Sequence, residues 1–281
     1  MLTPFADLLA HCRRGSAVGA FTCYDLETAG AALRAAAAAG DGVILLVGGR
    51  SYTDRDGHLL LAALVAVAAR ADAPACVQLD HCDDLAVIAS ALEAGAGAVL
   101  ADGSGLPVEQ NIELVAHAAA LARRHGASIE AELGGIAGDE DVAEAVAAGA
   151  LTDPAQAAEF VARTGADCLA VSIGNVHGSY REEPRLDWAR LEAIRDAIDA
   201  PLSLHGASGI PDAMLRRAIA SGIAKINVNT ELRGAYLDAT REILPSALEG
   251  SRLNVLHTAQ TDAVEAVIAG KLRAFDTREG G

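Results

Sequence analysis

The stretch Cys76-Val77-Gln78-Leu79-Asp80-His81 is an apolar run with the pattern of a buried β-strand, and it ends abruptly in a carboxylate and an imidazole. Neighbouring side chains of a regular strand point to opposite faces, so Asp80 and His81 can reach one ligand only where the strand gives way to a loop. The alternative is that Asp80 caps the following helix and that His81 is a packed histidine. The stretch therefore predicts a strand end that is either a site or a helix start.

Two other apolar runs end in the same way, the segment 169–177 at His177 and the segment 202–205 at His205. Three neutral imidazoles with one open position form the ligand set that is typical of a catalytic Zn²⁺. Whether His81, His177 and His205 meet depends on the fold, because they are far apart in the sequence.

Length and composition favour one large α/β domain, since the chain has 281 residues of which 52% are hydrophobic and 3% aromatic. The net charge of −16, from 38 acidic and 22 basic residues, would repel nucleic acid and anionic membrane surfaces. The sequence therefore predicts no nucleic-acid or membrane partner, and any phosphate must be bound locally.

Several features favour a cytoplasmic protein. The longest uncharged apolar stretch, residues 59–69, is too short to span a bilayer, and the first residues lack the basic and apolar regions of a signal peptide. The five cysteines are odd in number and lack C-x-x-C spacing. This pattern suits reduced thiols better than disulfides.

Strand-like and helical segments alternate along the chain, and each strand-like segment is followed by a helical one. The strands are expected at 17–21, 42–47, 76–81, 98–103, 128–133, 168–174, 202–206 and 225–230. This order predicts a closed (β/α)₈ (TIM) barrel forming a single domain over 1–281 with a C-terminal helical extension; a doubly wound open sheet is the alternative. In a barrel all strands end at one mouth, which would gather Asp80, His81, Asp102, Glu132, His177, His205, Asn229 and Thr230.

Two short segments at this mouth have the composition of a phosphate site. Gly206-Ala207-Ser208-Gly209 follows the seventh strand, and Asn229-Thr230 follows the eighth. Barrels commonly bind phosphate there through backbone N–H groups and hydroxyls. The alternative is an ordinary turn in which Ser208 caps the next helix.

Acidic residues also lie near the expected mouth. Asp102 and Glu132 could orient the histidines or hold a second cation, or could serve as helix caps or loop anchors. The segment 134–141 combines glycines with like charges, which favours a mobile loop over a packed one. Such a loop can deliver a carboxylate base.

Five ordered motifs resemble the zinc-dependent class II fructose-bisphosphate and tagatose-bisphosphate aldolases, over about Val18 to Phe275. They are LDH (79–81), EAELG (130–134) with GDED (138–141), IGNVHGSY (173–180), LHGASG (204–209) and KINVNT (225–230). The resemblance implies a carbon–carbon lyase. Such an enzyme reversibly cleaves fructose 1,6-bisphosphate or tagatose 1,6-bisphosphate to dihydroxyacetone phosphate and an aldehyde such as glyceraldehyde 3-phosphate.

The resemblance also implies roles for individual residues. Zinc would lie on His81, His177 and His205, with Asp80 as the acid/base at the aldehyde oxygen and Glu140 as the base for the ketone-side proton. Asp102 and Glu132 match positions associated with a second divalent ion, and a monovalent cation, Na⁺ or K⁺, is expected near the phosphate. The substrate and phosphate contacts would be Gly178, Arg181, Gly206, Ser208, Asn227, Asn229 and Thr230.

Arg252 resembles the family's arginine for the far phosphate, which is usually lent by a neighbouring subunit, and this implies a homodimer or homotetramer. The departures from the family pattern lie at substrate contacts, namely Thr22-Cys23-Tyr24, Gly48-Gly49-Arg50, Arg181 and Gly250-Ser251. A different phosphorylated ketose is therefore an open alternative.

Two rival functions fit the sequence less well. A Schiff-base aldolase needs a lysine at the mouth, whereas Lys225 begins the eighth strand, roughly 15 Å from its end at about 3.3 Å per residue, and Lys271 lies in the C-terminal helix. A non-catalytic sugar-phosphate-binding barrel would need neither Asp80 nor Glu140 as proton-transfer groups.

Overall fold

The computed structural model of the chain describes residues 1–11, 15–136, 150–178, 180 and 182–277. Within these residues the strands are β1 (Val18–Thr22), β2 (Val43–Gly48), β3 (Ala75–Cys82), β4 (Ala98–Ala101), β5 (Ser128–Leu133), β6 (Cys168–Val171), β7 (Leu202–Leu204) and β8 (Ile223–Val228). The helices are α1 (Phe5–His11), α2 (Leu26–Ala39), α3 (Gly49–Thr53), α4 (Gly57–Ala68), α5 (Leu85–Glu93), α6 (Val108–Arg124), α7 (Pro154–Thr164), α8 (Trp188–Ala197), α9 (Asp212–Ala220), α10 (Thr230–Glu249) and α11 (Leu253–Phe275).

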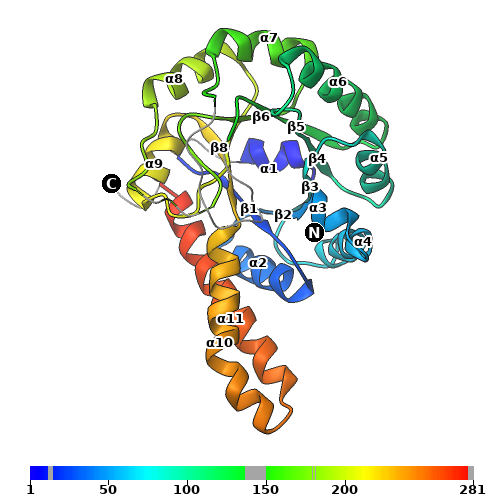
Figure 1. Cartoon of the computed structure of the whole chain (residues 1–281), viewed down its shortest axis with the longest axis vertical. Coiled ribbons are helices and arrows are strands. Elements are labelled where there is room, and N and C mark those ends of the chain that lie inside the picture. Colours follow the sequence, from blue (N-terminus) through cyan, green and yellow to red (C-terminus); the bar gives the residue numbers. More distant parts are fainter. Residues whose placement is uncertain (12–14, 137–149, 179, 181, 278–281) are drawn as a thin grey trace.

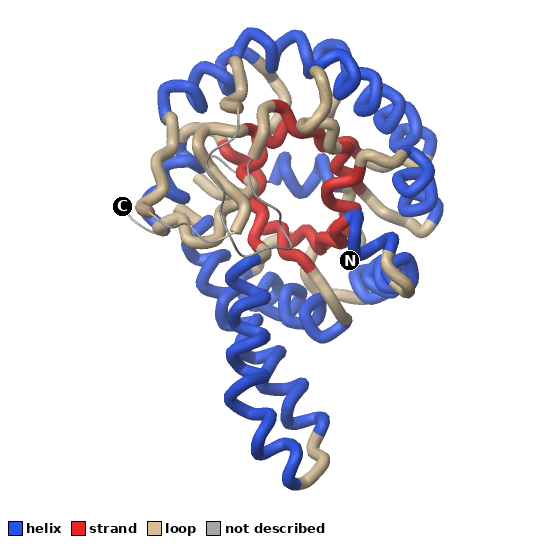
Figure 2. Tube along the Cα trace, in the orientation of Figure 1, coloured by secondary structure: helices blue, strands red, loops and turns tan. Residues whose placement is uncertain are grey.

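The strands form a closed parallel barrel in the order β1 to β8, and helices surround it (Figures 1 and 2). Closure is made by β1 and β8, where Val18 lies opposite Lys225. The predicted barrel is confirmed, and the doubly wound open sheet is excluded. Because every strand is parallel, all carboxyl ends lie at one mouth.

Helix α1 closes the opposite end of the barrel, where it is seen through the ring of strands in Figure 2. Phe5, Leu8 and Leu9 of α1 are buried in one cluster with apolar residues of the strands, among them Val18, Ile44, Leu46, Cys76, Ala98 and Cys168. The rest of the core lies in a second cluster that includes residues of the surrounding helices. The amino end of the barrel is thus apolar and blocked, which leaves polar chemistry to the mouth.

The alanine-rich segment is helical, as the sequence predicts, because both of its ends are capped. The Asp25 side chain accepts a hydrogen bond from the Thr28 backbone N–H, and the Thr28 hydroxyl accepts one from the Asp25 backbone N–H. Together these two bonds form a capping box. Gly40 ends the helix with a φ of 70°, a left-handed conformation that glycine adopts without steric cost. The small alanines let α2 pack against α11.

Helices α10 and α11 form a hairpin that projects from the barrel wall in Figure 1. The hairpin exposes large apolar side chains: Leu237 is 59% exposed, Leu248 70% and Leu253 61%. Among the described helices, none is both long and apolar enough to cross a membrane.

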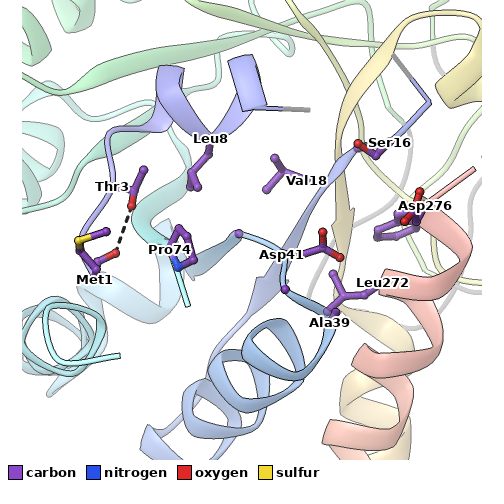
Figure 3. Close-up of a pocket in the computed structure, with 14 residues that line it drawn as sticks. Met1, Thr3, Leu8, Ser16, Val18, Ala39, Asp41, Pro74, Leu272 and Asp276 are labelled. Atoms are coloured by element: carbon purple, nitrogen blue, oxygen red, sulfur yellow. Dashed lines mark hydrogen bonds between the residues drawn. The ribbon is translucent and has the colours of Figure 1, made fainter. Parts of the chain in front are cut away.

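A cavity of about 520 Å³ lies at the amino end of the barrel, between α1, the start of β1 and the end of α11 (Figure 3). Its lining includes Leu8, Val18, Pro74 and Leu272. None of the clusters that could hold a metal within the described residues includes a residue from this lining. The chemistry therefore concentrates at the other end of the barrel.

Candidate active site

Asp80 and His81 reach the mouth because β3 does not end as a regular strand. His81 has a φ of 46°, in the left-handed region that residues with a side chain seldom adopt. The register between β3 and β4 shifts between Leu79 and Cys82. A β-carbon on Gly49 would lie 2.4 Å from the carbonyl oxygen of His81, so a glycine is needed beside this turn. This irregularity re-aims neighbouring side chains, as strand irregularities near sites commonly do.

The alternative in which Asp80 caps the next helix is wrong. The side chain of Asp84 caps α5 by accepting hydrogen bonds from the N–H groups of Ala86 and Val87. Asp80 is 1% exposed and lies in the lining of a cavity of about 330 Å³ at the mouth. That cavity is lined by Thr22, Gly48, Gly49, Arg50, Ser51, Asp80, His81, Asp102, Ser104, Glu132, Ile136, His177 and Asn229.

The three histidines meet at this mouth. One ring nitrogen each from His81, His177 and His205 lies within 4.8 Å of the others. The centroid of the His81 ring is 5.3 Å from that of His177 and 5.0 Å from that of His205. Residues that are far apart in the sequence are therefore brought together by the barrel.

Two carboxylates orient two of these imidazoles, those of His81 and His205. His81 Nδ1 lies 2.7 Å from Asp102 Oδ2, and His205 Nε2 lies 3.0 Å from Glu130 Oε1. An ionised carboxylate only accepts, so each of these nitrogens carries the proton and the opposite nitrogen presents a lone pair. The two remaining nitrogens, His81 Nε2 and His205 Nδ1, are 3.1 Å apart.

Two lone pairs at this separation repel each other unless a cation or a proton lies between them. Glu132 Oε2 is a further possible donor atom at the same place, 3.6 Å from His205 Nδ1. This oxygen is buried and accepts no hydrogen bond from the described part of the chain. The donor set therefore fits a divalent metal, and three imidazoles favour Zn²⁺.

A second group that could hold a cation shares one histidine with the first. His81, Asp102 and Glu132 offer atoms that lie within 4.8 Å of one another. Burial and the charge of Asp102 raise the pKa of Glu132 well above its usual range. Burial also acts to raise the pKa of Asp102, but the hydrogen bond and charge of His81 outweigh it and hold that pKa well below the usual value. Because the carboxyl groups of Asp102 and Glu132 lie so close together, a cation between them would be favourable.

Sequence reasoning missed a buried polar network beneath the histidines. Lys225 Nζ is 2.9 Å from Glu130 Oε2, and both side chains have no exposed surface. Lys225 also donates to Asn227 Oδ1 at 2.5 Å, and Gln78 donates to Glu130 at 2.6 Å. Asn227 Nδ2 in turn lies 3.4 and 3.5 Å from the two oxygens of Asp80. The network thus joins Asp80 to His205 through the barrel interior.

The sequence predicted that Lys225 lies far from the site, and for its side chain this is wrong. The side chain reaches Glu130, the carboxylate that contacts His205. Burial acts to lower the pKa of Lys225, but the charges of Glu130 and Asp80 more than offset this and raise it. A Schiff-base nucleophile must lose its proton, so this ammonium is unsuited to that role. The ion pair of Lys225 with Glu130 therefore argues against the Schiff-base rival more directly than distance does.

A second, glycine-rich cavity lies at the mouth, where the sequence predicts a phosphate site. A small cavity is lined by His177, Gly178, Gly206, Ala207, Ser208, Asn227, Asn229 and Thr230. Gly206 has a φ of 63°, and a β-carbon there would lie 2.1 Å from the carbonyl oxygen of Val176. Thr230 opens α10, whose first N–H groups favour an anion. Ser208 does not cap α9; it accepts a 3.4 Å hydrogen bond from the N–H of Glu231.

The remaining predicted residues lie elsewhere. Arg252 is exposed in the turn between α10 and α11, where it donates to the Ser246 carbonyl at 2.7 Å. That turn is at the far tip of the hairpin in Figure 1, well away from the mouth of the same chain. Arg181 and Glu140, with the acidic part of the predicted loop, lie outside the described residues.

Comparison with known proteins shows the family of the chain. The family described as "Fructose-bisphosphate aldolase class-II" matches residues 3–279. The D-tagatose-1,6-bisphosphate aldolase subunit GatY of Klebsiella oxytoca is 42% identical over 266 residues, covering 93% of this chain and 94% of that protein. The fructose-bisphosphate aldolase of Geobacillus stearothermophilus is 36% identical over 279 residues, 98% of this chain and 96% of that protein. The structure of the YdjI aldolase from Escherichia coli K12 superposes with a TM-score of 0.87 at 32% identity, covering 99% of both chains.

Proposed function

Since the chain belongs to the class II fructose-bisphosphate aldolase family, we propose that it reversibly cleaves tagatose 1,6-bisphosphate or fructose 1,6-bisphosphate. The products are dihydroxyacetone phosphate and glyceraldehyde 3-phosphate. The family consists of zinc-dependent aldolases, carbon–carbon lyases of carbohydrate metabolism. The observation that carries the proposal is the histidine cluster, in which two carboxylates turn ring nitrogens toward one centre beside a glycine-rich anion cavity.

In this proposal His81, His177 and His205 hold zinc, which when bound stabilises negative charge on the fragment that leaves as dihydroxyacetone phosphate. Asp80 accepts the proton of the C4 hydroxyl as the C3–C4 bond breaks. Glu140 returns a proton to the carbon of the dihydroxyacetone-phosphate fragment. Because the two carboxylates act on different atoms, their roles can be separated by experiment.

The phosphate of the dihydroxyacetone half is assigned to Gly178, Arg181, Gly206, Ser208, Asn227, Asn229 and Thr230. A monovalent cation, Na⁺ or K⁺, would offset phosphate charge there. Asp102 and Glu132 would hold a second divalent ion together with His81, a role supported by the closeness of their oxygens.

The choice of ketose is tested by measuring triose phosphate release from fructose 1,6-bisphosphate and tagatose 1,6-bisphosphate in parallel. These ketoses differ only in the configuration at C4, next to the proposed proton acceptor Asp80. We expect cleavage of at least one, abolished in His205→Ala. Cleavage of neither by zinc-loaded protein would reject both substrates and favour another phosphorylated ketose, for which Gly48, Gly49 and Arg50 in the mouth lining are candidate determinants.

The metal is tested on the same preparation. We expect about one tightly bound Zn²⁺ per chain, because ligands on rigid strand ends form a preorganised site. A chelator should abolish cleavage, and Zn²⁺ or Co²⁺ should restore it. Full activity in metal-free protein, or trapping of substrate on the protein by borohydride, would contradict the zinc mechanism.

We further propose that residues 1–281 form one domain whose C-terminal extension, the α10–α11 hairpin, joins copies of the chain into a homodimer or homotetramer. Leu237, Leu248 and Leu253 are exposed on it, and burying such residues between subunits is favourable. Arg252, which is remote from the mouth of its own chain, would then reach a neighbour's substrate phosphate.

A mixing experiment tests the shared site. Arg252→Ala retains the histidines, whereas His205→Ala retains the arginine, so neither variant alone should be fully active. Subunits exchanged between them should regain activity, since some mixed sites contain both intact residues. A monomer with full activity in sedimentation would overturn the proposal. A cytoplasmic location is also proposed, supported by the free thiols of Cys23, Cys76, Cys82 and Cys168.

A further inference from the structure

The second lysine of the chain is held directly behind the phosphate cavity. Lys271 of α11 places its Nζ 2.8 Å from Glu231 Oε1, and the same oxygen accepts the backbone N–H of Gly209 at 2.7 Å. Glu231 is the second residue of α10, and its own N–H donates to Ser208 Oγ at 3.4 Å. One carboxylate therefore joins three separate pieces of the chain: the loop after β7, the start of α10 and the end of α11.

This arrangement needs an explanation, because a carboxylate next to a phosphate loop is unfavourable on its own. Glu231 follows Thr230, which lines the cavity, and Gly209 follows Ser208, which lines it too. A negative charge so close would repel the phosphate of a substrate. The net charge of −16 adds to the repulsion.

Lys271 supplies the compensation. Its side chain is 11% exposed and that of Glu231 31%, so the ammonium is largely shielded from water and directed at the carboxylate. The ammonium group of Lys271 contacts the same Glu231 oxygen that accepts the N–H of Gly209. The charge of Glu231 is therefore neutralised at the point where the loop is held. The pair combines the orienting hydrogen bond of a carboxylate with little net charge.

We propose that Glu231 and Lys271 form a positioning pair for the phosphate loop. Glu231 fixes the backbone of Gly209 and the hydroxyl of Ser208, and Lys271 cancels the charge that this fixation places beside the anion. Neither side chain is required to touch the substrate. The inference rests on the proposed function, since it takes the cavity of Gly206 and Ser208 as the phosphate site.

The test is a double-mutant cycle of Lys271→Met, Glu231→Gln and the double variant. Lys271→Met leaves an uncompensated carboxylate, so we expect KM for the ketose and Ki for inorganic phosphate to rise roughly five- to twentyfold, as for one unscreened charge in partly solvated surroundings. Glu231→Gln keeps an oxygen that can accept from Gly209 and leaves an extra positive charge, so both constants should stay level or fall. The double variant should return close to wild type.

Arg34→Met is the matched control. Arg34 Nη2 pairs with Glu265 of α11 at 2.8 Å and is 53% exposed. This variant removes a positive charge beside the same helix without touching the loop. It should leave KM and Ki unchanged. In all variants kcat and zinc content should also be unchanged, because the pair does not contact the histidines.

Each outcome decides the inference separately from the proposed function. Suppose that wild type cleaves a ketose. If Lys271→Met then shifts KM and Ki less than twofold, or shifts them by the same factor whether or not Glu231→Gln is also present, the inference is wrong and the function stands. If wild type cleaves neither ketose while Lys271→Met still weakens binding of inorganic phosphate and the double variant restores it, the function is wrong and the positioning pair stands.

Discussion

Each of the two lysines of the chain pairs with a glutamate, but the two pairs lie in different surroundings. Lys225 and Glu130 are inside the barrel with no exposed surface, whereas Lys271 and Glu231 lie at its rim with 11% and 31% exposed. Removing one partner of a buried pair leaves an uncompensated charge, at a cost of about 3–5 kcal/mol. Exposed pairs typically contribute about 0–1 kcal/mol.

The two regions can therefore tolerate different changes. The interior pair belongs to a network that reaches His205 through Glu130 and Asp80 through Asn227. A substitution in this network is therefore expected to change both the stability of the fold and the geometry of Asp80 and His205. The rim pair holds only a loop and a helix start, so it can adjust affinity for an anion while the fold is preserved.

The largest expected effect separates the proposed roles of two carboxylates, Asp80 in the mouth and Glu140, which lies outside the described residues. Asp80→Ala and Glu140→Gln should each lower cleavage by on the order of 10²–10⁴-fold, as for loss of a general acid–base group. Glu140→Gln should also lose exchange of the dihydroxyacetone-phosphate C3 proton with solvent deuterium. Asp80→Ala should keep much of that exchange, because its proton belongs to the aldehyde oxygen.

Zinc content must be measured first in both variants, so that loss of metal is not mistaken for loss of a base. Normal exchange in Glu140→Gln together with lost exchange in Asp80→Ala would reverse the two roles. Glu140 would then have no part in the transfer of the ketone-side proton.

The next effect tests the interior pair. Lys225→Met should lower the free energy of unfolding by about 3–5 kcal/mol, since Glu130 would remain charged and buried beside His205. Denaturant unfolding measures the loss. Lys225→Met combined with Glu130→Gln removes both charges and should recover most of it. If the single variant is as stable as wild type, the buried network does not carry the energy assigned to it.

Most of the fold follows from patterns that lie within short segments. Most strands contain a short apolar run, and several of the helices that follow have a side-chain N-cap, such as Asp25 of α2 and Asp84 of α5. The parallel order then places every strand end at one mouth. This is why the three histidines could be grouped from the sequence although more than 120 residues separate His81 from His205.

The features that the sequence analysis did not predict depend on contacts between segments. The sequence contained a usable signal for the interior network: Gln78, Glu130 and Lys225 each precede a mouth residue by two positions, so they point to the same face of their strands. No comparable signal exists for Lys271, because its place behind Glu231 depends on how α11 folds back onto the barrel. The left-handed turn at His81 was likewise hidden, since nothing local favours a φ of 46° there.

The smallest expected effect is the stability change at the rim, and it separates the two regions most directly. Lys271→Met should lower the free energy of unfolding by less than about 1 kcal/mol, because Glu231, which is 31% exposed, stays partly hydrated when its partner is removed. Its effect on KM should shrink as salt is raised from about 0.1 to 1 M, where the Debye length falls from roughly 10 to 3 Å. The stability loss of Lys225→Met should persist over the same range, because the interior pair excludes solvent ions. Urea unfolding and ketose cleavage at both salt concentrations, with Arg34→Met alongside, measure all of these quantities. A loss in Lys271→Met as large and as resistant to salt as that in Lys225→Met would mean that the rim pair stabilises the fold as the interior pair does, and the distinction between the two regions would fail.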